Sequence, residues 1–135
     1  NTQILYPIDY NVSALCFYSQ LEYSPGDTIP EGYMGISVGK NSLAAYTEII
    51  NNSETIFYNA LMGAIDTPKT VGSAQKLFAA IAASKSYSVI AGGDSVALIE
   101  KADLANQISY LSTGGGATIA FLSGEPLPGL IALNE

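Results

Sequence analysis

Residues 110–119 read YLSTGGGATI, with three consecutive glycines between two apolar runs. Leu111 leads into the triplet and Ile119 follows it, so the pattern predicts a strand, a tight turn and a helix. Glycine weakens regular structure, and three of them at one junction need a physical reason. Surface linkers also contain glycine, but usually among Ser, Pro and charged residues. The stretch therefore indicates a βα junction rather than a linker.

The composition is that of one folded domain. The chain has 135 residues, of which 48% are hydrophobic and 13% are charged. That is enough apolar side chain to bury a core, and too much for a disordered chain. The longest strictly apolar run, residues 77–83, is far shorter than the about 18 residues of a membrane span. The sequence does not open on a basic segment, so we expect no signal peptide.

The charged residues exclude several functions. The net charge is −7, and all five cations are lysines, with no arginine and no histidine. Nucleic acids and anionic membranes are disfavoured as partners, because both are bound through clusters of positive charge. Without histidine, the chain has no Ser-His or Cys-His nucleophile. Cys16 is the single cysteine, so we expect a small buried side chain and neither a disulfide nor a multi-cysteine metal site.

Strand-like and helix-like apolar periods alternate along the chain. Strands are expected at residues 4–10, 55–58, 87–90 and 108–111, with an irregular segment at 11–31. Helices are expected from 41 or 42 to about 50, then at 71–81, 94–99 and 117–122. This alternation predicts an α/β fold, with a mostly parallel sheet and helices on both faces in a Rossmann-like three-layer arrangement. No domain boundary is visible, so residues 1–135 are expected to form one domain.

Glycines recur where predicted strands pass into helices. The four junctions carry Gly35, Gly63, the pair Gly92 and Gly93, and the triplet at 114–116. Parallel strands end at one edge of a sheet, and a helix that begins there presents free N–H groups with partial positive charge. Such an edge binds anions without arginine, which favours a phosphate-bearing ligand. The alternative is that the glycines only tighten the turns, and neither standard glycine-rich nucleotide fingerprint is present.

A family resemblance rests on four motifs in order. Residues 91–135, AGGDSVALIEKADLANQISYLSTGGGATIAFLSGEPLPGLIALNE, resemble the carboxy-terminal pattern GGGDS…EKAGL…STGGGA…LEGK-LPG of phosphoglycerate kinases. Upstream, NALMGAID at 59–66 is similar to the family's NGPMGVFE, and IPEGYMGISVG at 29–39 is similar to IPDGWMGLDIG. ILYPIDYNVS at 4–13 is similar to LPVDFVVA. The resemblance covers essentially the whole chain.

The resemblance implies a glycolytic phosphotransferase, which moves a phosphoryl group between 1,3-bisphosphoglycerate and ADP with Mg²⁺ in the cytoplasm. This chain would be most of its nucleotide-binding domain, a single partial domain over residues 1–135. By the motifs, Gly35, Ile36, Leu61 and Ala64 would border the adenine, Asn59 would lie near the phosphates and Asp66 would hold the ribose. Gly92, Gly93, Asp94 and Ser95 would form the phosphate loop, with Asp94 supporting the magnesium of ADP or ATP. Gly114, Gly115 and Gly116 would stabilise the transferring phosphoryl group. Phosphoryl transfer depends on positioning and charge stabilisation, so the missing histidine is no obstacle.

The chain departs from the family pattern at several positions. Ala60 and Leu61 replace Gly-Pro, Asp66 replaces Glu, Ala91 replaces Gly, and Ser37 replaces Asp. The family's phosphoglycerate-binding domain and a lysine-bearing Gly-Gly-Ala-Lys segment have no counterpart in this sequence. We therefore expect no turnover from the chain alone, 3-phosphoglycerate or 1,3-bisphosphoglycerate as a substrate only together with that domain, and self-association through exposed apolar surface. The alternatives are an interaction or scaffold module that keeps the fold without binding nucleotide, and an unrelated α/β domain with tight turns.

Overall fold

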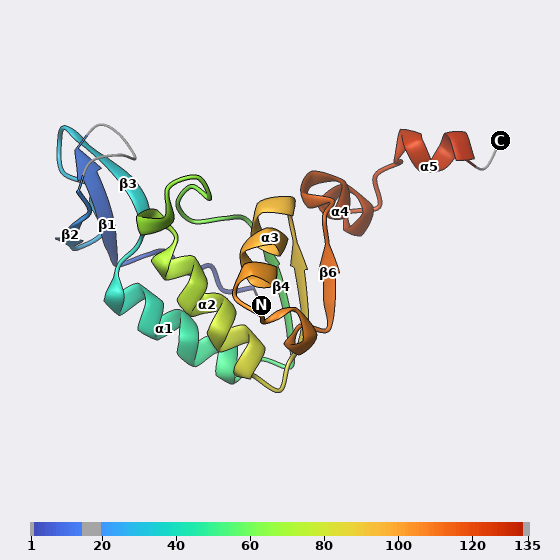
Figure 1. The fold of residues 1–135 in the computed structure, drawn as a ribbon, viewed down its shortest axis with the longest axis horizontal. Coiled ribbons are helices and arrows are strands. Elements are labelled where there is room, and N and C mark those ends of the chain that lie inside the picture. Colours follow the sequence, from blue (N-terminus) through green and yellow to red (C-terminus); the bar gives the residue numbers. More distant parts are fainter. Residues whose placement is uncertain (1, 15–19, 134–135) are drawn as a thin grey trace.

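The computed structural model describes residues 2–14 and 20–133, and the prediction for Cys16 lies outside these ranges. The chain forms two three-stranded sheets joined through a pair of helices (Figure 1). The strands are β1 (Asp9–Ala14), β2 (Glu22–Pro25), β3 (Tyr33–Val38), β4 (Thr55–Asn59), β5 (Tyr87–Ala91) and β6 (Tyr110–Ser112). The α-helices are α1 (Lys40–Asn51), α2 (Gly72–Ala83), α3 (Gly93–Lys101), α4 (Gly115–Leu122) and α5 (Pro128–Leu133). Short 3₁₀ turns, η1 (Pro68–Thr70) and η2 (Ala105–Gln107), precede α2 and β6.

The parallel sheet has the strand order β4-β5-β6. Alternate residues of each strand point toward α2 and α3, as the period of a β-strand requires. Ile56, Ile90 and Leu111 face this way and pack with Phe78 of α2 and Ile99 of α3 in the main core. The α/β class with a parallel sheet flanked by helices is thus confirmed. The opposite face of the sheet is bordered by α4 and otherwise remains open.

The predictions for residues 4–10 and 11–31 were wrong. Residues 4–8 are not a strand, and β1 begins only at Asp9, after Pro7. β1 pairs with β2 and β3 in an antiparallel sheet of order β2-β1-β3. Most of β1 and all of β2 lie in the segment 11–31 that was expected to be irregular, and β3 follows it. The sheet buries polar side chains on both faces: Ser24 is buried on the side of Val12, and Ser13 is buried on the opposite side. Sequence periodicity detects buried apolar side chains, and it therefore missed these strands. It also missed the short helix α5 near the end of the chain.

A buried carboxylate fixes α1 to the antiparallel sheet. Asp9 of β1 has no exposed surface, and its Oδ1 accepts hydrogen bonds from the Ser42 N–H at 2.8 Å and the Ser42 hydroxyl at 2.6 Å. Its Oδ2 accepts from the Asn41 N–H at 2.8 Å and the Tyr23 hydroxyl at 3.1 Å. A Cβ on Gly39 would overlap this carboxyl group, so the residue before the helix has to be glycine. The first turn of α1 is therefore capped by a side chain from a distant strand.

The described residues form no helix that is long and apolar enough to cross a membrane.

Candidate functional site

The three parallel strands end level with one another. Asn59, the last residue of β4, pairs with Ala91 of β5, and Ala91 pairs with Ser112 of β6. The segments that follow these strands therefore start side by side at the carboxyl edge of the sheet. This is the edge at which parallel α/β sheets bind ligands.

The two predicted glycine loops touch each other at this edge. The Gly92 N–H donates a hydrogen bond to the Ser112 carbonyl at 2.9 Å. A Cβ placed on Gly115 would lie 3.4 Å from Asn59 Oδ1 and 3.5 Å from Gly92 Cα. Gly92 has a φ of +112°, a conformation that side chains rarely adopt. The fold thus brings together Asn59, the phosphate loop and the glycine triplet, which the sequence predicted to share one site.

Two helices begin here with free backbone donors. No side chain of the described residues accepts a hydrogen bond from the N–H groups of Gly93 and Asp94 in α3, or of Gly115 and Gly116 in α4. The Gly114 N–H, just before α4, is in contact with the Ser112 hydroxyl at 3.3 Å. Each helix N-terminus carries the equivalent of roughly half a positive charge. The arrangement can therefore stabilise an anion at the ends of β5 and β6.

A cavity of about 260 Å³ lies on the phosphate-loop side, and Ala60, Leu61, Gly92, Gly93, Asp94 and Ser95 line it. Ser95 is buried, and its hydroxyl donates to the Ala60 carbonyl at 2.7 Å. The Ser95 side chain therefore ties the loop after β4 to α3, and its role is positional. Asp94 is exposed in the first turn of α3. Its carboxylate is free to reach a ligand in the cavity.

The candidate adenine residues are distributed over two places. Gly35 and Ile36 line a separate cavity of about 250 Å³ together with Tyr10, Ile29, Ser37, Val38 and Met62. Leu61 instead lines the phosphate-loop cavity, so the adjacent residues Leu61 and Met62 connect the two hollows. The sequence assigned no role to Met62. In the sequence, the one indication of a role for Met62 was its position inside the NALMGAID motif.

The structure does not bring Ala64 and Asp66 to either cavity. Ala64 lies in a turn held by Thr70, whose hydroxyl accepts from the Ala64 N–H at 2.8 Å. Gly63 is in the left-handed region with a φ of +90°, and a Cβ there would overlap the Thr70 backbone. Asp66 follows on this turn with its side chain exposed. A role of Asp66 in holding a ribose stays a prediction.

The residues present fit a magnesium ion that arrives with a nucleotide, and do not form a metal site of their own. No group of three or more metal-ligating side chains occurs in the described part of the chain. Mg²⁺ keeps much of its water and is usually held by one or two carboxylates plus substrate phosphates. Asp94 alone at the phosphate-loop cavity supplies a single carboxylate of this kind.

Taken together, the parallel sheet and its glycine-rich carboxyl edge define a Rossmann-like α/β protein. The sequence model of the family described as "Phosphoglycerate kinase" matches residues 1–125, and the chain belongs to this family. It is 40% identical over 114 residues to "Phosphoglycerate kinase, cytosolic" of Triticum aestivum, an alignment that covers 82% of this chain and 28% of that protein. It is 37% identical over 117 residues to the phosphoglycerate kinase of Deinococcus radiodurans, over 85% of this chain and 28% of the relative.

Solved structures agree with this assignment. The phosphoglycerate kinase of Pyrococcus horikoshii OT3 superimposes with a TM-score of 0.79 at 31% identity, covering 95% of this chain and 32% of that one. The enzyme of Coxiella burnetii gives 0.78 at 31% identity, covering 88% and 31%. The chain thus spans about 28% of the length of the curated relatives that it matches. The relatives are phosphotransferases by name.

Proposed function

We propose that this chain is the nucleotide-phosphate-binding portion of a phosphoglycerate kinase, acting in phosphoryl transfer between 1,3-bisphosphoglycerate and ADP. The observation that carries the proposal is the meeting of the Gly92 loop and the Gly114–Gly116 triplet at the carboxyl edge. Asn59 Oδ1 lies beside both, 3.6 Å and 3.4 Å from where a Cβ on Gly92 and on Gly115 would be. Free N–H groups of two helices face this point. A nucleotide phosphate supplies the negative charge that such an arrangement favours.

The residues of this chain would act by position and charge. The N–H groups of α3 would hold the nucleotide phosphates, and those of α4 would stabilise the charge of the phosphoryl group in transit. Asp94 would hold the magnesium ion, which neutralises the phosphate oxygens when it is bound. Gly35 and Ile36 would border the adenine. A carboxylate and a diphosphate are the groups between which the phosphoryl moves, and neither requires a general base.

The chain alone would not turn over substrate. None of its lysines lines the phosphate-loop cavity, so the cationic part of a phosphoryl-transfer site has to come from elsewhere. We propose that 1,3-bisphosphoglycerate or 3-phosphoglycerate binds only when the rest of the family's length is present. The Triticum relative is cytosolic by name, and we propose the cytoplasm for this chain as well. We further propose that the isolated chain self-associates.

Calorimetric titration with Mg-ADP tests nucleotide binding. We expect saturable heat from the unmodified chain and at least tenfold weaker binding after Asp94→Ala, since the substitution removes the carboxylate beside the loop. Glu100→Ala is the matched control, because Glu100 is an exposed carboxylate on the same helix α3, outside the cavity. Equal affinity of the Asp94→Ala and unmodified chains would contradict the role given to Asp94.

A non-catalytic interaction module is the second candidate. The replacement of the family's Gly-Pro by Ala60 and Leu61 beside the phosphate loop, and the position of Asp66 outside both cavities, favour it. It predicts no saturable heat with ADP up to about 1 mM, an affinity too weak for function at that concentration. The same titration therefore separates the two functions.

A further inference from the structure

A β-bulge in β3 shapes the base cavity, the hollow of about 250 Å³ that residues 35–38 line together with Met62. The register of β1 against β3 shifts between Asn11 and Val12, which leaves Ile36 as the extra residue of β3. Alternate residues of a regular strand face opposite sides, whereas a bulge bends the strand and redirects its side chains. The four consecutive residues 35–38 can therefore all border one cavity.

A carboxamide on β1 holds the residues that follow the bulge. Asn11 Nδ2 donates to the Ser37 hydroxyl oxygen at 3.0 Å and to the Val38 carbonyl at 2.8 Å. Ser37 and Val38 come directly after Ile36, so these two bonds fix the strand where it leaves the bulge. Asn11 does not itself line the base cavity. It can act on a ligand there only through Ser37 and Val38.

A serine on α2 completes the hydrogen-bonded cluster of Asn11, Ser37 and Ser73. The Ser73 hydroxyl donates to the Val38 carbonyl at 2.9 Å, and the Ser37 hydroxyl donates to Ser73 Oγ at 3.3 Å. Asn11 Nδ2 lies 3.2 Å from Ser73 Oγ. Ser37 and Ser73 are both buried, and a buried polar group that loses its partner is costly. The cluster therefore ties β1, β3 and α2 together at the bulge.

Two members of the cluster depart from the family pattern. Ser37 stands where the motif IPDGWMGLDIG has aspartate, and Asn11 stands where LPVDFVVA has valine. A valine could donate no hydrogen bond to residue 37, whereas the carboxamide of Asn11 supplies two donors. The serine leaves every side chain that lines the base cavity uncharged. An uncharged, mostly apolar cavity suits a flat neutral ring better than a phosphate.

We propose that Asn11 is a positioning residue for the nucleoside part of the ligand, because its carboxamide, together with Ser37 and Ser73, holds the bulge of β3 in the shape of the base cavity. The inference rests on the proposed function, which places the adenine of ADP beside Gly35 and Ile36. It concerns the base and not the phosphates.

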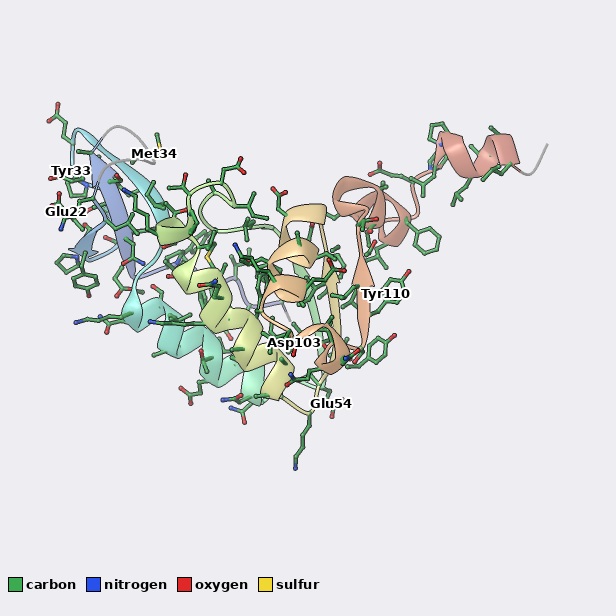
Figure 2. The ribbon with its side chains drawn as sticks, viewed as in Figure 1. Glu22, Tyr33, Met34, Glu54, Asp103 and Tyr110 are labelled. Carbon is green, nitrogen blue, oxygen red and sulfur yellow. The ribbon has the colours of Figure 1, made fainter. Side chains whose placement is uncertain are left out.

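The cluster is remote from the glycine triplet. Figure 2 shows β3, marked by Tyr33 and Met34, separated by α2 and α3 from β6, marked by Tyr110. The triplet follows β6, and none of the three cluster residues lines the phosphate-loop cavity. Loss of the Asn11 carboxamide should therefore weaken the binding of the nucleoside and leave the binding of the phosphates unchanged.

Calorimetric titrations with Mg-ADP and with Mg-pyrophosphate separate these two parts of the ligand, because pyrophosphate has the diphosphate of ADP without the nucleoside. Asn11→Leu keeps the size of the side chain and removes both donors. We expect at least fivefold weaker ADP binding and unchanged pyrophosphate binding. Asn52→Leu is the matched control, since the Asn52 carboxamide makes an exposed bond to the Glu48 carbonyl at 2.9 Å, outside the base cavity. It should bind both ligands as the unmodified chain does.

Ser73 provides a second pair of variants. Ser73→Ala should also weaken ADP binding, and Ser73→Thr should restore it, because threonine keeps the hydroxyl that bonds the Val38 carbonyl. Hydrogen exchange at the amides of residues 35–38 should accelerate in Asn11→Leu and in Ser73→Ala. Circular dichroism with a thermal melt verifies that each variant is folded.

The outcomes separate failure of the inference from failure of the proposed function. A folded Asn11→Leu chain with the ADP affinity of the unmodified chain would overturn the inference alone. Equal losses of ADP and pyrophosphate binding would overturn it as well, since they would reflect a general loosening of the fold. An unmodified chain that binds neither ligand would overturn the proposed function and, with it, any role of Asn11 at a nucleotide.

Discussion

The helix N-termini at the two sheets differ in whether the chain itself supplies an acceptor for their first N–H groups. At the antiparallel sheet, the first turn of α1 is capped by the buried carboxylate of Asp9, which accepts four hydrogen bonds. At the parallel sheet, α3 and α4 begin next to each other with no carboxylate or hydroxyl bound to the N–H groups of Gly93, Asp94, Gly115 and Gly116. Both places carry the partial positive charge of a helix end.

The carboxylate of Asp9 therefore has a structural role at α1, whereas the open N-termini of α3 and α4 form a candidate binding site. A helix end that the chain satisfies internally contributes to stability and has no capacity left for a ligand. A helix end whose first N–H groups have no acceptor within the chain costs some stability and remains open to an external anion. Substitutions at the first kind should therefore change the free energy of unfolding, and substitutions at the second should change binding.

The largest expected effect is at Asp9. Asp9→Ala leaves the N–H groups of Asn41 and Ser42 without their acceptor and should lower the free energy of unfolding by about 3 kcal/mol. Chemical denaturation measures this. Asp94→Ala removes an exposed carboxylate near the start of α3 and should change the free energy of unfolding by less than about 0.5 kcal/mol. Equal losses in the two variants would contradict the distinction between the two helix ends.

Lowering the pH should also destabilise the chain through Asp9. Burial raises the pKa of Asp9, but the hydrogen bonds from Ser42, Asn41 and Tyr23 outweigh it and hold the pKa below its ordinary value of 3.8. A carboxylate with a lowered pKa in the folded chain contributes stability above pH 3.8, and this contribution is lost as the pH falls through the folded pKa. Asp9→Asn should abolish this part of the pH dependence in denaturation curves between neutral and strongly acidic pH.

The next effect is on binding at the parallel sheet. Gly115→Ala places a methyl group in contact with Asn59 Oδ1 and Gly92 Cα, between the two helix ends, at distances that the fold tolerates. We expect at least tenfold weaker Mg-ADP binding in calorimetry, with the melting temperature unchanged or raised because alanine favours helix. Gly72→Ala is the control, since a Cβ at that helical glycine meets no atom within 4 Å. Unchanged ADP affinity in Gly115→Ala would argue against an anion between α3 and α4.

Ser95→Ala should loosen the loop that follows β4. The substitution removes the buried hydrogen bond to the Ala60 carbonyl, at a cost of about 1 kcal/mol. Hydrogen exchange at the amides of Leu61 and Met62 should accelerate, and Ser95→Thr should restore the slow rate. The Ser123 hydroxyl makes a similar but exposed bond to the Ala120 carbonyl, so Ser123→Ala should have little effect. Unchanged exchange in Ser95→Ala would show that the hydroxyl does not position the loop.

The smallest effect concerns Tyr58 on β4. Its hydroxyl is the one buried side-chain polar atom of the described residues with no hydrogen-bond partner, and its ring packs edge-on against Phe78. Tyr58→Phe removes this unpaired group and should leave stability unchanged or raise it by up to about 1 kcal/mol. A decrease of more than that in denaturation would indicate that the hydroxyl has a partner.

The raised pKa of the Tyr58 phenol predicts that the stability of the fold decreases at alkaline pH. Burial raises the pKa of Tyr58 from 10.0 to about 12. An acid whose folded pKa is raised contributes stability below pH 10, and the contribution is lost as the pH rises from 10 through 12. The Tyr58→Phe chain should lack this loss, whereas Tyr87→Phe, at an exposed position, should retain it.

The sequence predicted the parallel part of the molecule well. β4, β5, α2 and α3 were expected close to their observed bounds, because each carries its apolar residues at the period of its own structure. Four glycine junctions were predicted to share one edge, and the register of Asn59, Ala91 and Ser112 brings the Gly92 loop and the glycine triplet together there. The prediction was wrong for Gly35, which lies inside β3 of the antiparallel sheet and not between a strand and a helix. These features follow from local pattern plus the rule that parallel strands end together.

The antiparallel sheet depended on tertiary structure. Asp9, Asn11 and Ser13 alternate along β1 with Tyr10, Val12 and Ala14, and this alternation does not indicate that Asp9 and Ser13 are buried as well. Their burial is stable only because partners more than 20 residues away supply hydrogen bonds: Ser42 for Asp9, and Ser37 and Ser73 for Asn11. No local window of sequence contains both members of such a pair.

The sequence by itself determined the α/β class, the glycine-rich edge and the family, since these depend on residue types in local order. Only the tertiary structure decided that Ser95 binds a backbone carbonyl, that Asp66 lies away from both cavities and that one face of the sheet is open. The physical reason is that a side chain's role is set by what packs against it. That neighbour is chosen by the fold as a whole, through contacts between residues far apart in the chain.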